Sequence, residues 1–261
     1  MKFSRTTRKV FYEKPMLFSL ETTFIKCIED CIELEATIAY PEGGGQESDV
    51  GVLTTETVSL RFIHAKKRYA HSPLLRDFPG IQVDGIVLHQ IHPDDIDKMS
   101  LLKEGEPVVM TIDIEKRYAH SLSHTASHLL YAAVMTHRPD VIKQTLGCHI
   151  KQGAARFDFA TQNRFTIDEL AAMQIMATDL SKQALPIFIS AHPEVPDARI
   201  WCCDQYQIPC GGTHLSSTLP IGEMQLSRKS LGAGKERITC QFPYAQTQES
   251  ALEFLNIGYL P

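Results

Sequence analysis

The sequence predicts an α+β fold, in which a small N-terminal β-barrel is followed by an α/β region with helices packed on a sheet. Two observations carry this prediction. Short apolar runs separated by glycine and proline clusters fill residues 1–112, and helical patterns first appear in residues 113–261. Many short strands joined by turns are typical of a barrel, whereas helices among strands are typical of a layered arrangement. We therefore divide the chain into domains of residues 1–112 and 113–261.

The first region contains three strand-like segments. EATIAY (35–40) alternates and is rich in strand-forming residues, and VSLRFIH (58–64) and GIVLHQI (85–91) are apolar and β-branched. Turn-forming clusters of glycine and proline lie between and after them, at 41–51, 72–80 and 103–107. This alternation of short strands and turns predicts the barrel.

The second region begins with a helix. The pattern predicts a helix over 117–137, ended by Pro139. Thr166 and Glu169 form a capping-box pattern, which predicts a second helix that runs to about Gln183. Four strand-like runs follow, at 186–190, 198–203, 223–228 and 236–242, and together they predict one sheet with helices packed on it.

Composition predicts a globular protein with an ordinary core. The chain has 261 residues, of which 43% are hydrophobic and 22% are charged. No stretch reaches the apolar length needed to cross a bilayer, and the basic N-terminus lacks the apolar run of a signal peptide. The seven cysteines are scattered and odd in number, which favours reduced thiols over a disulfide framework. We expect a cytoplasmic protein with no membrane partner.

The charge balance restricts the class of partner. A net charge of −5 and a pI of about 6.1 argue against a general nucleic-acid binder, which usually has a basic domain. Local basic clusters are usually a solvated face, although they can also contact phosphates. One cluster is Arg61, Lys66, Lys67 and Arg68, and the other is Arg228, Lys229, Lys235 and Arg237.

Two pairs of candidate metal ligands stand far apart in the sequence. His124 and His128 are four residues apart on the predicted helix, so their side chains point the same way and can share one ion. Cys210 and His214 are four residues apart in PCGGTH. Two such pairs are typical of a tetrahedral zinc site. Because Thr125 stands where HExxH has its glutamate, a zincin-type protease is disfavoured.

His120 leaves an alternative open. It lies one helical turn before His124, so it can replace His128 as a ligand or act behind the ligands as a hydrogen-bond partner. Cys148 and His149 are interpreted as ordinary strand residues.

Three motifs together resemble a known family: HTASHLL (124–130), CGGTHL (210–215) and GGGQESDVG (43–51). With these motifs in this order and at this spacing, the chain is similar to the freestanding alanyl-tRNA editing proteins of the AlaX type. These proteins are relatives of the editing domain of alanyl-tRNA synthetase. The likeness extends over residues 35–242. It matches the medium form, because the chain is too short for the additional C-terminal domain of the long form.

The resemblance implies that the second domain is an editing domain, with one zinc ion held by His124, His128, Cys210 and His214 as the catalytic residues. It implies an aminoacyl-tRNA hydrolase, a carboxylic ester hydrolase that removes serine or glycine from mischarged alanine-specific tRNA. Such a second site is needed because a synthetase pocket separates amino acids that differ by one small group by only about 1–3 kcal/mol. The partner is then tRNA, with no stable protein partner implied and with monomer and dimer both open. Nucleotide and ATP binding are further expectations from the related ligase.

The resemblance also assigns contacts to the substrate. Thr145 falls where the family has a threonine that hydrogen-bonds the serine hydroxyl, and Gln144 and Phe159 fall at pocket positions. In the family the glycine-rich run lies near the editing site and affects serine selection, and here its polar candidates are Gln46 and Asp49.

Two further sets of contacts are expected. Backbone amides of the Gly211–Gly212 turn are candidates for stabilising an oxyanion. Basic side chains are expected to contact phosphates of the tRNA acceptor end, which makes binding salt-dependent. These residues are Lys116, Arg117, Arg228, Lys229, Lys235 and Arg237.

Two other functions stay open on the sequence alone. One is a zinc-stabilised RNA-binding module without hydrolysis, and the other is a metal-dependent hydrolase of small esters or amides. The role of zinc is also open, because four protein ligands leave no position for an attacking water. Residues 1–30 and 64–80 match the family loosely, and the second of these segments is a candidate for partner specificity.

Overall fold

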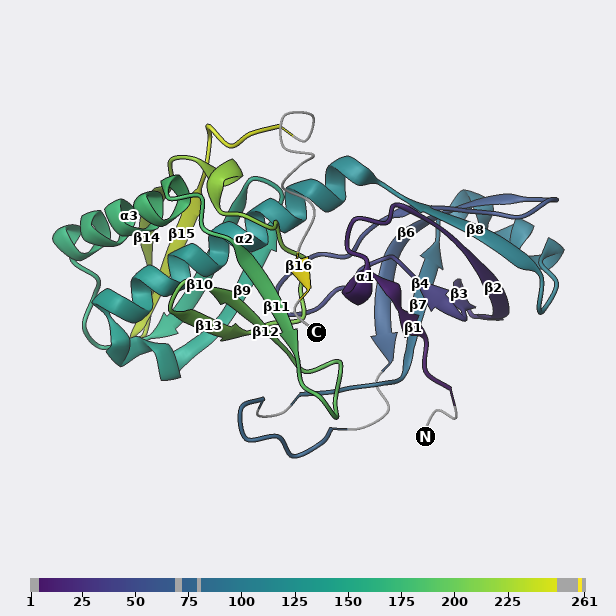
Figure 1. Cartoon of the computed structure of the whole chain (residues 1–261), viewed down its shortest axis with the longest axis horizontal. Helices are drawn as coiled ribbons and strands as arrows, with labels where there is room; N and C mark the ends of the chain where they lie inside the picture. The colour runs from purple at the N-terminus through teal and green to yellow at the C-terminus, as the bar shows by residue number, and fades with distance from the viewer. Residues whose placement is uncertain (1–4, 69–71, 79–80, 248–257, 260–261) are drawn as a thin grey trace.

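The computed structural model describes residues 5–68, 72–78, 81–247 and 258–259. A closed barrel forms one end of the molecule, and two four-stranded sheets with the helices α2 and α3 form the other (Figure 1). The predicted α+β fold with an N-terminal barrel is therefore confirmed.

The barrel has its strands in the order β2–β3–β7–β6–β5–β8, and it closes where β2 pairs antiparallel with β8. Leu34, Phe62 and Met110 are at most 1% exposed and belong to an apolar core inside it. A short strand β1 (Arg8–Lys9) and helix α1 (Val10–Glu13) precede the barrel, and β1 pairs in parallel with β4 (Ala36–Thr37). The barrel strands are β2 (Ser19–Ile28), β3 (Cys31–Leu34), β5 (Gly51–Thr54), β6 (Ser59–Arg68), β7 (Ile86–Ile91) and β8 (Pro107–Ile112), with a 3₁₀ segment η1 (Pro93–Leu101) before β8.

The predicted strands at 58–64 and 85–91 correspond to β6 and β7, whereas the segment 35–40 contributes only the two-residue strand β4. The sequence pattern misses β2, because most of its side chains are exposed or half-buried and it therefore has no continuous apolar run. The expected variable segment 64–80 is strand β6 up to Arg68, and residues 69–71 and 79–80 lie outside the described residues.

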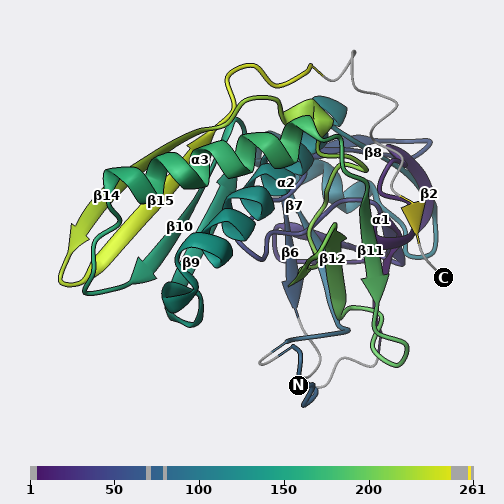
Figure 2. The same cartoon turned by 60° about the vertical axis from the view of Figure 1, so that its left-hand side comes forward.

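The long predicted helix is α2 (Ile114–His137), and it begins earlier than expected. Asp113 caps it by accepting a hydrogen bond from the Lys116 N–H at 3.0 Å. A 3₁₀ segment, η2 (Pro139–Gln144), follows its end. The helix α3 (Ile167–Lys182) has the predicted capping box in full, with Thr166 and Glu169 each bonding the other's backbone N–H. It lies along a sheet beside α2 (Figure 2).

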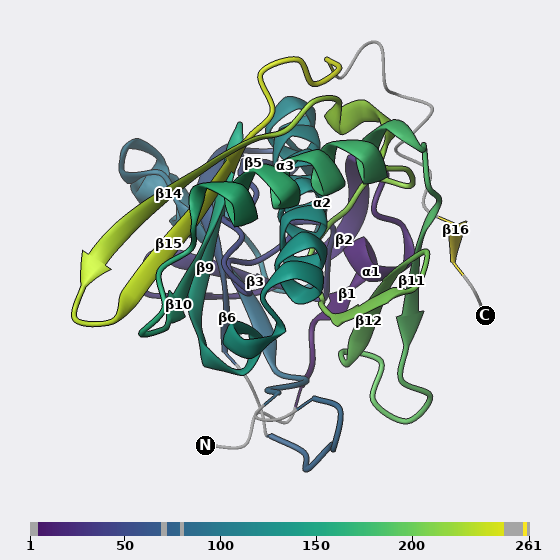
Figure 3. The same cartoon turned by 90° about the vertical axis from the view of Figure 1, so that its left-hand side faces the viewer.

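The prediction of one sheet after residue 113 is wrong, because the strands form two. α2 is buried on nearly every side, and one sheet covers each flank (Figure 3). On one flank it contacts β9 and β10, and on the other the Trp201 ring of β12 lies 4.6 Å from the His128 ring. The first sheet is β14 (Gln225–Gly232), β15 (Lys235–Gln241), β10 (Ala154–Ala160) and β9 (Thr145–Lys151), and the second is β13 (Tyr206–Pro209), β12 (Arg199–Cys203), β11 (Ile187–Ala191) and β16 (Gly258–Tyr259).

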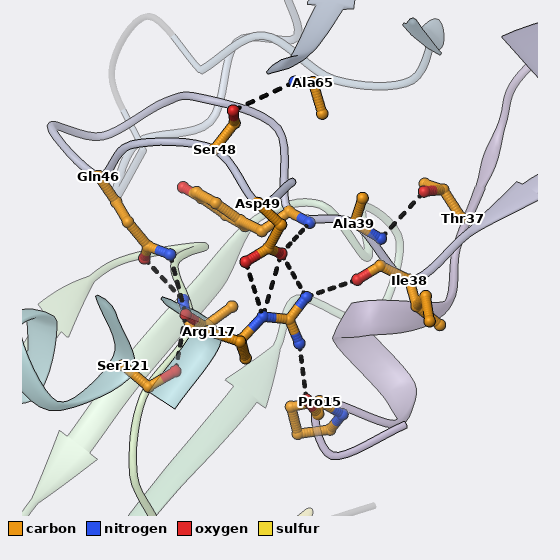
Figure 4. Close-up of polar contacts among 12 residues, drawn as sticks. Pro15, Thr37, Ile38, Ala39, Gln46, Ser48, Asp49, Ala65, Arg117 and Ser121 are labelled. Atoms are coloured by element: carbon orange, nitrogen blue, oxygen red, sulfur yellow. Dashed lines mark hydrogen bonds and ion pairs between the residues drawn. The ribbon is translucent and has the colours of Figure 1, made fainter. Parts of the chain in front are cut away.

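A buried ion pair joins α2 to the barrel (Figure 4). The Arg117 guanidinium binds both carboxylate oxygens of Asp49, with Nη2 2.5 Å from Oδ2 and Nε 3.2 Å from Oδ1. It also donates to the carbonyls of Pro15 at 2.7 Å and Ile38 at 2.5 Å. Asp49 accepts a further bond from the Tyr40 N–H at 2.6 Å. One side chain of α2 thus holds three separate segments of the N-terminal region.

We expect Arg117→Met to lower the free energy of unfolding by about 3–5 kcal/mol, because it leaves the Asp49 carboxylate buried without its partner. Urea unfolding followed by circular dichroism measures this change. The neighbouring substitution Lys116→Met, on a half-buried side chain, serves as the control and should change the free energy by less than about 0.5 kcal/mol. If Arg117→Met were as mild as the control, the ion pair would not be what holds the two parts together.

Candidate metal centre and pocket

Four side chains from two distant segments meet beside α2. His124 and His128 come from the helix, and Cys210 and His214 come from the turn after β13. The Cys210 Sγ lies 3.3 Å from Nε2 of both His124 and His214. All four potential ligand atoms lie within 4.8 Å of one another. The structure therefore brings the two predicted ligand pairs together.

The geometry and chemistry of these residues fit a metal ion. Sulfur and nitrogen ligands around one tetrahedral zinc stand roughly 3.5 Å apart, close to the distances seen here. The Nδ1 atoms of His128 and His214 are buried without a hydrogen-bond partner. For His214 this nitrogen points away from the cluster, because its Nε2 faces the Cys210 sulfur, so the fit to a metal ion rests on the convergence of the four donor atoms. The cluster can thus hold a metal ion.

Burial sets the protonation of the cluster. It lowers the pKa of His124 to about 3 and holds the pKa values of His128 and His214 well below the usual range, so these imidazoles are neutral. It also raises the pKa of the Cys210 thiol to about 12. A metal ion would reverse the last effect, because a coordinating thiol is deprotonated outright.

Gln46 orients His124. Its Oε1 lies 2.6 Å from His124 Nδ1 and also accepts the Thr213 N–H at 3.1 Å, while its Nε2 donates to the Thr213 hydroxyl at 2.9 Å (Figure 4 shows Gln46 beside Ser121). Ser121 completes the network by donating to the same hydroxyl at 2.9 Å. Because an amide oxygen only accepts, His124 carries its proton on Nδ1 and presents a lone pair on Nε2 toward Cys210.

Gly212 is required by the closeness of His124. A Cβ at this position would stand 2.0 Å from Cε1 and 2.2 Å from Nδ1 of the imidazole. Its N–H donates to Cys210 Sγ at 3.3 Å, so this amide supports the sulfur. Gly211 and Gly212 both line the pocket, and the stabilisation of an oxyanion by their backbone amides stays a prediction.

The cluster opens onto a pocket of about 630 Å³. His124, His128 and Cys210 are part of its wall, and both halves of the molecule contribute to it. The C-terminal half supplies Ser127, Tyr131, Thr145, Cys148, Ile150, Phe157, Asp197, Arg199, Ile208, Pro209, Gly211 and Gly212. The N-terminal half supplies Tyr12, Tyr40, Gly43, Gly44, Lys67, Phe78, Ile81 and Gln82.

The predicted substrate contacts divide into two groups. Thr145 lines the pocket, with its Oγ1 3.2 Å from the Tyr131 hydroxyl. Gln144 is exposed at the end of η2 and is not part of the wall, so its assignment is corrected. Phe159 is also corrected, because it is fully buried against Phe165, 5.8 Å between ring centres.

Phe157 takes the place expected of Phe159. It lies two residues earlier on the same face of β10 and lines the pocket directly.

The polar residues of the glycine-rich run, Gln46 and Asp49, do not contact the pocket as expected, because both are 0% exposed. Gln46 bonds the Nδ1 atom of His124, and Asp49 forms the buried ion pair with Arg117. Neither residue forms part of the pocket wall.

The predicted phosphate contacts lie outside the pocket, and Arg117 is not accessible to a phosphate. Its side chain is 1% exposed and fully engaged with Asp49, so this assignment is corrected. Lys229 and Lys235 are exposed on the hairpin of β14 and β15, and Lys116 is half-buried. Two further arginines on that hairpin are partly exposed and ion-paired, Arg228 with Glu236 and Arg237 with Asp158.

His120 is not part of the ligand cluster. Its Nε2 lies 3.6 Å from Glu47, which also contacts His149 at 3.5 Å.

Sequence reasoning missed several pocket residues: Tyr12, Lys67, Tyr131, Cys148 and Arg199. Tyr131 stands one helical turn after His128, so the helical periodicity contains a signal for it.

All seven cysteines are free thiols, as predicted, and within the described residues no helix has the length and apolar character to span a membrane.

No model of a known protein family matches the chain. Curated proteins named alanine–tRNA ligase do align with it. Those of Methanocorpusculum labreanum and Pyrococcus furiosus are each 27% identical, over 258 and 259 residues respectively, covering 89% of this chain and 25% of theirs. That of Methanothermobacter thermautotrophicus is 27% identical and is covered over 26% of its length. The chain thus spans about a quarter of the relatives it matches, and the resemblance to alanyl-tRNA synthetase is confirmed.

We expect Gln46→Leu to weaken zinc binding by about 10- to 100-fold, because His124 loses the acceptor that fixes its tautomer. Competition with a chromogenic chelator measures the affinity. Gln144→Leu, a matched change on an exposed side chain, should leave it unchanged. Equal affinities for the wild type and Gln46→Leu would mean that packing alone orients the imidazole.

We also expect the binding of one zinc ion to release about one proton near neutral pH. The histidines are already neutral because their pKa values are lowered, so the thiol of Cys210, with its raised pKa, is the group that gives up a proton. Calorimetry in buffers of different ionisation enthalpy counts the protons. Cys210→Ser should reduce the release to near zero. An unchanged count in that variant would remove Cys210 from the ligand set.

Proposed function

We propose that this protein is a trans-acting aminoacyl-tRNA hydrolase of the cytoplasm, which releases serine or glycine from mischarged alanine-specific tRNA. The observation that carries the proposal is the Cys/His cluster in the wall of a pocket of about 630 Å³. Structural metal sites are closed, whereas a cluster that faces a pocket is placed to act on a bound molecule. The relatives named alanine–tRNA ligase supply the substrate class.

The cofactor in this proposal is one zinc ion held by His124, His128, Cys210 and His214, because three imidazoles and a thiolate suit zinc. When bound, it supplies Lewis-acid chemistry and can lower the pKa of a coordinated water. The chain's own contribution is the orientation of the ligands. Gln46 holds the tautomer of His124, and the Gly212 N–H supports the sulfur of Cys210.

Selection of serine over alanine rests on the hydroxyl of Thr145. Its Oγ1 donates to the Ile142 carbonyl at 2.8 Å, so its own proton is already used. Tyr131 is then the donor in the 3.2 Å contact between the two hydroxyls. One lone pair of Oγ1 remains to accept a hydrogen bond. A serine hydroxyl can donate to it, whereas an alanine methyl would leave it without a partner.

The tRNA body is bound outside the pocket in this proposal. Lys229 and Lys235 are exposed and Lys116 is half-buried, and Arg228 and Arg237 can exchange their carboxylate partners for phosphates. Each phosphate contact adds to the salt dependence of binding.

The direct test is deacylation of seryl-, glycyl- and alanyl-tRNA, all on alanine-specific tRNA, with and without a zinc chelator. We expect rapid loss of serine, sensitive to the chelator, with alanine spared. Retained tRNA binding without hydrolysis would favour a zinc-stabilised RNA-binding module. Hydrolysis of small esters that deacylated tRNA does not inhibit would favour a small-ester hydrolase.

We expect Thr145→Val to slow the hydrolysis of seryl-tRNA by about 10-fold, since the loss of one hydrogen bond of about 1 kcal/mol or more removes the partner of the substrate hydroxyl. Glycyl-tRNA has no side-chain hydroxyl, so its hydrolysis should change little and serves as the internal control. The ratio of the two kcat/KM values measures the effect. Equal loss on both substrates would mean that Thr145 shapes the pocket without selecting serine.

A further inference from the structure

The sheet β14–β15–β10–β9 has helices on one side only. Its inner side carries buried apolar residues such as Phe157, Phe159 and Ile238, and α2 and α3 pack against that side (Figure 2). Successive side chains of a strand point to opposite sides of a sheet, so the residues between these lie on the outer side. Within the described residues no helix covers the outer side, where most side chains are exposed or half-buried.

The outer side is rich in cations. The strand register places Arg156 opposite His149 and Lys229 opposite Arg237, all on this side. Two further lysines lie on the same side, each two residues along its strand from one of these positions. We call the following five residues the basic face: Lys151, Arg156, Lys229, Lys235 and Arg237.

The positive charge of the basic face is only partly compensated. On the outer side of these four strands the one carboxylate is Asp158, and it binds both arginines of the basic face. Its Oδ2 lies 2.5 Å from Nη1 of Arg156, and its Oδ1 lies 2.7 Å from Nε of Arg237. The three lysines are exposed, and no ion pair among the described residues involves them. This face is therefore positive in a chain whose net charge is −5.

The cations form a diagonal band across the sheet. Lys151 lies on one edge strand, β9, and Lys229 lies on the other, β14. Three strand spacings and four residues along the strands separate them, which amounts to about 20 Å. A band of this length can contact several successive phosphates of a nucleic-acid backbone, which carry closely spaced negative charges.

The side chains of the outer side favour a double-stranded RNA over an unpaired one. Single strands are held by aromatic rings on which the bases stack, and on this side His149 is the one ring, because Phe157 and Phe159 lie on the inner side. RNA duplexes are recognised mainly through their phosphates and 2′-hydroxyls. Neutral side chains that can bond such groups lie around the cations: Gln225, Ser227, Thr239 and Gln241.

The basic face and the pocket lie on opposite sides of the same strands. Cys148 and Ile150 of β9 line the pocket from the inner side. The glycine-rich run covers part of the β9 edge, where Gln46 pairs with Ile150. At Leu146 and Gly147 the chain is exposed, and a Cβ on Gly147 would meet open space. An unpaired end of an RNA bound to the outer side can pass this edge to reach the pocket.

We propose that the basic face binds the phosphate backbone of an RNA duplex, the acceptor stem of the substrate, while the unpaired 3′ end crosses the β9 edge into the pocket. The inference rests on the proposed function, which supplies the RNA. It adds Lys151 and Arg156 to the contacts and places the duplex on one side of one sheet. Arg228 lies opposite Ile238, on the inner side, and is not part of this face.

The test measures the binding of an unacylated RNA hairpin, made of the acceptor duplex and its unpaired 3′ end, by fluorescence anisotropy over a range of salt concentrations. One variant combines three substitutions in the basic face: Lys151→Gln, Lys229→Gln and Lys235→Gln. We expect it to bind the hairpin about 10- to 100-fold more weakly, and the slope of log affinity against log salt to fall by about 2–3.

The matched control makes the same change in net charge at three exposed lysines elsewhere: Lys14→Gln, Lys103→Gln and Lys182→Gln. It should bind the hairpin as the wild type does. Equal weakening in both variants would overturn the proposal, because net charge alone would then set the affinity. Unchanged binding in the first variant would overturn it too. So would an unpaired RNA of the same length that binds as tightly as the hairpin and depends equally on the three lysines.

Hydrolysis separates this inference from the proposed function. We expect the basic-face variant to lower kcat/KM on seryl-tRNA by about 10-fold or more and to leave 3′-O-seryl-adenosine, which has no duplex, unchanged. If the wild type binds the hairpin through these lysines but hydrolyses neither ester, the proposed function fails while the RNA surface stands. If the wild type and the variant hydrolyse seryl-tRNA equally well, only the RNA surface fails.

Discussion

The geometry of the whole site depends on one buried ion pair, Arg117 with Asp49. A charge pair out of water is stable only when every remaining donor and acceptor is satisfied, and here the carbonyls of Pro15 and Ile38 and the amide of Tyr40 complete it. Asp49 lies in the glycine-rich run, so its capture by α2 fixes that loop against the helix. The same loop then delivers Gln46 to the back of His124, two turns further along the helix. The ion pair between Arg117 and Asp49 includes no metal ligand, yet through Gln46 it determines which nitrogen of His124 faces Cys210.

The second constraint is the burial of α2 between two sheets. A helix covered on both flanks cannot follow a simple amphipathic pattern, and this one is rich in serine, alanine and histidine on its buried sides. Small side chains let the strands approach the helix closely. The buried hydroxyl groups form hydrogen bonds within the helix itself, because Thr125 donates to the Ser121 carbonyl and Ser127 to the His124 carbonyl. The imidazoles are therefore surrounded by packed protein on all sides except the pocket, and this surrounding accounts for their neutral state.

Local signals allowed much of the fold and the metal ligands to be predicted. The capping box at Thr166, the spacing of His124 and His128, and the turn chemistry of PCGGTH depend only on neighbours in sequence, and each appears as predicted. The errors have a common cause in tertiary contacts. Nothing near Arg117 reveals that its partner is Asp49, 68 residues away. Similarly, Lys67 and its neighbours read as one basic cluster, because which of them points inward depends on the register of β6 with β7. Phe157 and Phe159 share a face and are both buried, but Phe159 packs against Phe165 whereas Phe157 lines the pocket.

The sequence separation of the ligands has a consequence for biosynthesis. His124 and Cys210 are 86 residues apart, and the segment between them contains α3 and most strands of the two sheets. Ribosomes add about 5–20 residues per second, and chains fold from the N-terminus as they emerge. The barrel can close while α2 is still being made, but its histidines have no thiolate to meet until the turn at Cys210 leaves the exit tunnel. A nascent chain therefore has no complete ligand cluster, and the four candidate ligands come together only once the segment that carries Cys210 has folded against α2.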